Sequence, residues 1–153
     1  ARLHPGYDTH PPAISPRVVV PLDASSLRCA ATVYARFLKV PLHICRDIRT
    51  PECSKLLENV QRDVNIALVI EFAAMAPLLG LDAHEVLAAA RTKYNWVDVR
   101  PGPGVGGHCI PVDPYDPIEE ARRVGFEPRP SSLARQVTHE EIGRASRSEE
   151  DDG

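Results

Sequence analysis

The sequence predicts a mainly α-helical protein with a small α/β element at its N-terminal end. Residues 17–45 contain short β-branched runs on either side of one helical pattern. Residues 50–80 form a long helical pattern, and residues 101–117 are rich in glycine and proline. Of the 15 prolines, 12 fall within residues 1–21 and 101–130, so the middle of the chain is left free to form helices.

The N-terminal part predicts a β-α-β unit that follows an extended, proline-rich lead. Arg17 to Leu22 is typical of a strand with Pro21 at its end, and Leu42 to Cys45 is a second short strand. Asp23 is a candidate cap for a helix over Ala24–Leu38. This helix has one apolar stripe, formed by Leu27, Ala30, Ala31, Tyr34 and Leu38. We therefore assign residues 1–48 to the C-terminal edge of an α/β domain.

A long helix is expected to begin at Thr50-Pro51-Glu52, which supplies an N-cap oxygen, a proline at the first helical position and an acidic residue in the first turn. Its first half has two stripes. The apolar stripe consists of Leu56, Val60 and Val64, and the polar stripe consists of Lys55, Asn59 and Arg62.

Residues 64–81 are apolar almost all round. A membrane span is excluded because Asn65, Glu71 and Pro77 interrupt a stretch that barely reaches the roughly 20 residues a bilayer needs. We instead expect a helix buried on several faces, partly against a second subunit. Gly80 is expected to close it, and Asp82 to cap a short helix over Ala83–Ala90.

Residues 101–117 predict a structured loop without helix, followed by a brief helix over Ile118–Val124 and a disordered tail from Arg144. The glycines Gly102, Gly104, Gly106 and Gly107 match a dinucleotide fingerprint, but His108-Cys109-Ile110-Pro111 cannot open the helix that such a site requires. The loop is either a plain tight turn or a segment whose backbone approaches a ligand closely.

Cys109, presented by this loop, is either an inert small hydrophobic residue or an activated nucleophile. Lys55 and Asn59 are either a solvated helix face or two donors that converge on a carbonyl oxygen. Asp113 follows four residues after the cysteine. His108 should point to the opposite face of an extended segment, so a Cys-His dyad is not indicated.

Composition excludes several classes of protein. The net charge is −3, which argues against a nucleic-acid partner. The four cysteines show no zinc-ligand spacing, so we expect no metal and give a zinc-binding domain little weight. The N-terminal residues lack the features of a signal peptide, and reduced thiols suggest the cytoplasm. The absence of an initiator methionine suggests a trimmed or partial chain.

The segments KLLENVQRDVNIALVIEF (55–72) and PGPGVGGHCIPVDPY (101–115) closely resemble the central domain of the UDP-glucose/GDP-mannose dehydrogenase family, the NAD-dependent UDP-sugar 6-dehydrogenases. The residues of these two segments are most similar to the branch of the family that acts on UDP-N-acetyl-D-mannosamine. Residues 17–49 weakly resemble the end of the family's Rossmann domain, and residues 118–138 the lead into its UDP-binding domain. The resemblance implies a helical central dimerisation domain at 49–117 and the start of the UDP-binding domain, with a tail, at 118–153.

The resemblance also implies a chemistry, in which a cysteine captures the intermediate aldehyde during oxidation of the sugar C6 alcohol by NAD. Cys109 matches that cysteine, Lys55 and Asn59 match the groups that hold the oxyanion and a water, and Asp113 matches the residue that assists them. The glycine-rich loop, with Arg62, would contact the UDP-sugar, and the long helix would form a homodimer.

The sequence departs from the family pattern at several positions. It has no N-terminal glycine fingerprint for NAD, and Ile70-Glu71 stands where the family has Asn-Glu. Asn95 stands where the family often has an arginine, although Arg91 and Arg100 lie nearby. Thr138 stands where the family has an asparagine three residues after the arginine of Ala134-Arg135. We therefore expect a partial enzyme with little turnover alone; the alternative is a non-catalytic dimerisation module left from such an enzyme.

Overall fold

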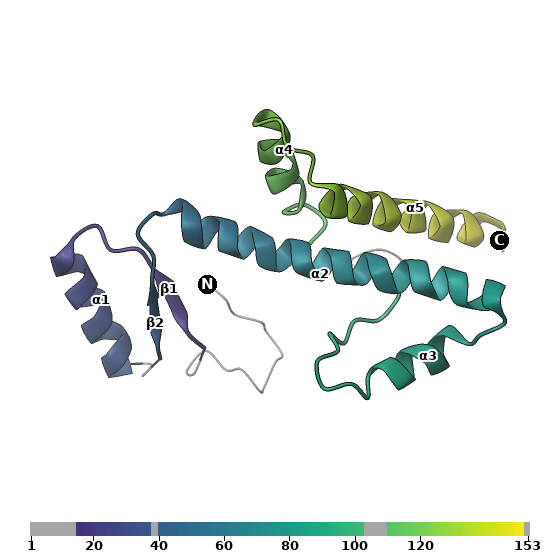
Figure 1. Ribbon diagram of the computed structural model, residues 1–153, viewed down its shortest axis with the longest axis horizontal. Coiled ribbons are helices and arrows are strands. Elements are labelled where there is room, and N and C mark those ends of the chain that lie inside the picture. Colours follow the sequence, from purple (N-terminus) through teal and green to yellow (C-terminus); the bar gives the residue numbers. More distant parts are fainter. Residues whose placement is uncertain (1–14, 38–39, 103–109, 152–153) are drawn as a thin grey trace. The chain divides into compact units, whose positions relative to one another are not determined.

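The computed structural model describes residues 15–37, 40–102 and 110–151, with the side chains of the last helix described as far as residue 141. The chain divides into two compact units, residues 1–55 and 56–153, and the division falls inside one long helix. The element order is β1, α1, β2, α2, a short 3₁₀ helix η1, α3, α4 and α5 (Figure 1). The described elements are therefore mainly helical, as the sequence predicts.

The first unit contains a β-α-β element. Strand β1 (Arg17–Val19) pairs in parallel with β2 (Leu42–Ile44), with Val18 opposite His43, and helix α1 (Ala24–Phe37) connects them. The expected cap is confirmed, because the Asp23 carboxylate accepts from the Ser26 backbone N–H at 2.7 Å. The strands are shorter than expected because Val20 and Pro21 follow β1 without continuing the ladder.

Helix α1 has no fully buried residue, and the described members of its predicted apolar stripe are only half-buried; Leu38 lies outside the described residues. Leu27, Ala30, Ala31 and Tyr34 are nevertheless less exposed than the other apolar positions of the helix, Val33 and Phe37, which are 47% and 73% exposed. The described part of the stripe is therefore the less exposed side of α1, but it is not buried, whereas an apolar stripe at this spacing predicts a buried face.

Helix α2 (Arg49–Met75) begins one residue before the expected N-cap. Thr50 is not the capping residue. The Asp47 carboxylate instead accepts from the Arg49 backbone N–H at 2.9 Å and from the Arg49 side chain, which also lowers the pKa of Asp47. Thr50 and Pro51 therefore lie inside the first turn, where a missing N–H costs little.

The second half of α2 passes into η1 (Ala76–Leu79) at Pro77 and ends at Gly80, which has a φ of 72°. The Gly80 N–H donates to Pro77 and the Leu81 N–H donates to Ala76, the two bonds of a Schellman motif. Asp82 then caps α3 (Ala83–Ala90) through the backbone N–H groups of His84 and Glu85. Both boundaries agree with the sequence prediction.

Helix α4 (Tyr115–Arg123) begins inside the segment for which no helix was expected. Pro114 is its N-cap and Pro117 lies in its first turn, where a proline removes no intrahelical hydrogen bond, so the prolines allow a helix here.

Helix α5 (Arg129–Asp151) includes the polar run that was expected to be disordered, so that expectation was also wrong. Figure 1 shows α5 running beside α2. Residues buried in this unit include Ala67, Ile70, Leu87, Ile118 and Ala134.

Candidate active site at the α2 and α4 contact

The candidate site centres on a contact between α2 and the turn that precedes α4. The Asn59 amide nitrogen donates to the Asp113 carboxylate at 2.5 Å, across 54 residues of sequence. Asn59 is completely buried, and Asp113 is half-buried. The structure therefore brings together two of the four residues that resemblance assigns to catalysis.

The turn holding Asp113 is fixed by its neighbours. Pro114, the next residue, is fully buried, and the Tyr115 backbone N–H donates to the Val112 carbonyl at 3.0 Å. A proline fixes its own φ and restricts the residue before it, so Pro114 limits the backbone conformation of Asp113. The carboxylate is thus presented to Asn59 by a short segment with little freedom.

Lys55 lies one helical turn before Asn59 on α2 and is half-buried. Arg62, the third member of the predicted polar stripe, is also half-buried. Both side chains take part in interactions, so neither is a freely solvated charge. The polar stripe of the sequence prediction is therefore turned at least partly toward protein, most completely at Asn59.

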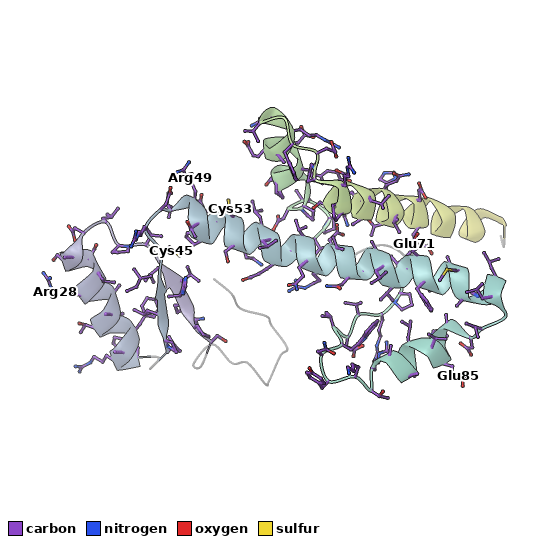
Figure 2. All side chains as sticks on the ribbon, viewed as in Figure 1. Arg28, Cys45, Arg49, Cys53, Glu71 and Glu85 are labelled. Atoms are coloured by element: carbon purple, nitrogen blue, oxygen red, sulfur yellow. The ribbon has the colours of Figure 1, made fainter. Side chains whose placement is uncertain are left out.

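The proposed nucleophile lies outside the described residues, together with most of the loop that carries it. Cys109, His108, Gly104, Gly106 and Gly107 all fall in this undescribed segment. Gly102 is described, and a Cβ placed there would meet no atom within 4 Å, so space beside its backbone is open. The other cysteines, Cys29, Cys45 and Cys53, are free thiols, and only Cys45 is buried; Figure 2 marks Cys45 and Cys53.

A second buried polar contact adjoins the first. Asp63, one turn after Asn59 on α2, is completely buried and accepts from the Nε of Arg135 at 2.7 Å, while its other oxygen pairs with Nη2. Arg135, from α5, is also buried. Burial lowers the pKa of its guanidinium, and the Asp63 carboxylate that faces it compensates its charge.

Sequence reasoning missed Asp63 and Arg135 as a pair. The signal for Asp63 was present, because positions 55, 59 and 63 continue one helical face at steps of four. The signal for Arg135 was weak, because the pairing joins residues 72 positions apart.

The β-α-β element of the first unit has a pocket of about 330 Å³, which is lined by Val18, His43, Cys45 and side chains from the start of α2. Among the described residues there is no group of three or more metal-ligating side chains.

Fold and site together define a helical domain in which an amide on α2 binds a carboxylate from the turn before α4. Residues 49–140 match the model of the UDP-glucose/GDP-mannose dehydrogenase family, central domain, and the chain belongs to this family.

Three relatives illustrate the similarity. The chain is 39% identical over 106 residues to the UDP-N-acetyl-D-mannosamine dehydrogenase of Methanocaldococcus jannaschii, covering 69% of this chain and 25% of that protein. It is 36% identical over 127 residues to the UDP-N-acetyl-D-glucosamine 6-dehydrogenase of Pseudomonas aeruginosa, covering 83% and 30%. The solved UDP-D-ManNAc dehydrogenase of Pyrococcus horikoshii is 32% identical, with a TM-score of 0.74 over 87% of this chain and 31% of that one. The chain thus spans between a quarter and a third of their lengths.

None of the helices in the described ranges is long and apolar enough to cross a membrane.

Proposed function

We propose that this chain is the central domain of a cytoplasmic, NAD-dependent UDP-sugar 6-dehydrogenase that oxidises UDP-N-acetyl-D-mannosamine to the uronic acid, for use in surface polysaccharide synthesis. The observation that carries the proposal is the part-buried Asn59–Asp113 contact, which joins two residues of the catalytic pattern that lie 54 positions apart in the sequence. The relatives that act on UDP-N-acetylhexosamines support the substrate class.

In the proposed chemistry, the Cys109 thiolate adds to the C6 aldehyde of the half-oxidised sugar and forms a thiohemiacetal. Loss of a hydride from C6 converts this adduct into a thioester. Water then attacks the thioester carbon, the carbon–sulfur bond breaks, and the carboxylate leaves with the thiol restored. The hydride acceptor is NAD, and because the sequence carries no N-terminal glycine fingerprint for it, this chain is expected to have little turnover by itself.

Two groups on α2 are proposed to act on the oxygen that becomes negatively charged. The Lys55 ammonium supplies charge, and the Asn59 amide supplies a second N–H donor to this oxygen or to the attacking water. Asp113 orients the Asn59 amide by accepting from it and receives a proton from the water as it attacks. Gly102, Gly104, Gly106 and Gly107 let the backbone approach the sugar, and Arg62 contributes positive charge for the UDP phosphates.

The test compares the alkylation rates of the four thiols. The chain is treated with iodoacetamide at pH 7, and each cysteine peptide is followed by mass spectrometry. Cys109 is expected to react at least about ten times faster than the exposed Cys29 and Cys53, because only a thiolate stabilised by neighbouring donors is present in quantity at this pH. Equal rates would refute an activated nucleophile. Cys29 and Cys53 serve as internal controls for accessibility.

Substrate choice is tested with the same readout. UDP-N-acetyl-D-mannosamine should slow alkylation of Cys109 at lower concentration than UDP-N-acetyl-D-glucosamine or UDP-glucose. The reverse order would assign the chain to another substrate of the family.

The second candidate function is a dimerisation module without catalysis. It is favoured by apolar side chains on one face of α2, where Leu57, Leu68 and Met75 are 68%, 56% and 41% exposed at steps of 11 and 7 residues. A groove of about 380 Å³ between α2 and α5 adjoins Leu68. Both candidates therefore include a homodimer through α2, and the thiol rates separate them.

A further inference from the structure

A small cluster joins the buried ion pair to the candidate site. The Arg135 guanidinium carbon lies 5.8 Å from the centroid of the Tyr115 ring, within the range of a cation–π contact. Tyr115 is the first residue of α4 and follows Asp113 by two positions. Arg135 therefore contacts α2 through Asp63 and the start of α4 through Tyr115.

The two polar pairs on α2 occupy one face of the helix, one turn apart. Asn59 meets Asp113, and Asp63 meets Arg135. Because Arg135 also contacts Tyr115, the chain of contacts runs from Asp63 to Arg135, to Tyr115, and back along the backbone to Asp113. These contacts connect the position of the Asp113 carboxylate to the Asp63–Arg135 ion pair, and neither residue of that pair belongs to the proposed catalytic set.

Stability alone is a weak explanation for this arrangement. A buried ion pair often contributes no more than apolar side chains of similar volume, because both charges lose hydration. The ion pair does more to fix the relative positions of its neighbours than to stabilise the fold. A planar guanidinium can bind a carboxylate with two hydrogen bonds and stack on an aromatic ring at the same time.

We propose that Asp63, Arg135 and Tyr115 are positioning residues, which hold the Asp113 carboxylate against the Asn59 amide. The inference rests on the proposed function only in giving that contact a catalytic use. The contact itself is measured independently of catalysis.

The test uses Tyr115→Leu with Tyr115→Phe as its matched control. Both variants lose the phenolic oxygen, but only the leucine variant loses the ring on which Arg135 stacks. Tyr115 is 44% exposed, so the leucine variant is expected to keep most of its stability. The readout is the ¹H–¹⁵N resonance of the Asn59 side-chain amide and its rate of hydrogen exchange, measured at fixed pH.

Tyr115→Leu is expected to shift this resonance and speed its exchange at least about tenfold, whereas Tyr115→Phe should match the unsubstituted chain. Arg135→Lys should behave like Tyr115→Leu, because an ammonium keeps the charge opposite Asp63 but loses the planar stack. Unchanged Asn59 exchange in Tyr115→Leu, with a folded spectrum, would overturn the proposal. So would equal changes in the leucine and phenylalanine variants.

The outcome is separable from the proposed function. Slow alkylation of Cys109 would refute the catalytic role of the site and leave the Asn59 result standing. An unresponsive Asn59 amide together with a fast Cys109 would refute the positioning role alone.

Discussion

Replacing Asp63 by leucine is expected to lower the free energy of unfolding by about 3–5 kcal/mol. The reason is the burial of its partner, since Arg135 is only 7% exposed and would keep an uncompensated charge in the protein interior. Such a loss is a large part of the roughly 5–15 kcal/mol that stabilises a typical domain. Arg135→Met should cost a similar amount, because it leaves the Asp63 carboxylate buried without a cation.

The double variant Asp63→Leu with Arg135→Met should recover most of the loss, because two apolar side chains of similar volume replace two desolvated charges. The assay is urea unfolding of all four proteins, followed by circular dichroism at 222 nm and extrapolated to water. The exposed pair Arg123–Glu120 provides a control cycle, with an expected coupling below about 0.5 kcal/mol. If the two losses at Asp63 and Arg135 simply add, the ion pair does not couple these residues and the reasoning is wrong.

Four further predictions concern single positions. Asn59→Asp places a second carboxylate opposite Asp113, so the variant should be less stable than the parent at pH 7. It should regain stability as the pH falls, because the two carboxylates then share a proton, and the melting temperature measured against pH checks this. Gly80→Ala should cost about 1 kcal/mol in urea unfolding because of the left-handed φ of 72°, with Gly102→Ala as a control in open space. Asp82→Ala should also cost about 1 kcal/mol, whereas Asp82→Ser should restore most of it; equal losses would exclude the capping role. The Arg122 side chain lowers the pKa of Glu127, so the stabilising effect of this pair is present above the ordinary glutamate pKa and is lost as the pH falls through the lowered value. The stability difference between Glu127→Gln and the parent should therefore be largest near pH 7 and shrink steadily as the pH is lowered below the ordinary glutamate pKa, as measured by urea unfolding at each pH.

Capping residues and helix-forming composition predict the bounds of those helices whose ends depend only on neighbouring residues in the sequence. Helix α3 was predicted residue for residue, because Asp82 caps its start and its composition favours a helix. The start of α4 was missed for an equally local reason. The three prolines within residues 111–117 predict a loop, but Pro114 is the N-cap of α4 and Pro117 lies in its first turn, where a proline breaks no intrahelical hydrogen bond.

The candidate site was predictable only in part. Resemblance supplied Asn59 and Asp113, and the structure shows them in contact. The Asp63–Arg135 pair was beyond local reasoning, because neither residue type indicates burial and charged residues are almost never fully buried unless paired. The partner of such a residue is set by how α5 packs on α2, which no short sequence window contains.

The polar face of α2 has a consequence for how its neighbours dock. Ala67 and Ile70, buried on α2, accept many apolar partners at similar cost, so they constrain the register of α5 only loosely. Asp63 accepts very few, because a buried carboxylate without a cation is strongly unfavourable. Moving α5 by one residue would rotate Arg135 by about 100° and bring Gln136, a neutral and now exposed side chain, toward that carboxylate. The ion pair therefore selects one register of α5 on α2, and that register places Arg135 over Tyr115. Apolar replacement of both charges could preserve the free energy of unfolding and still loosen the Asn59–Asp113 contact, a separation that stability measurements alone would not reveal.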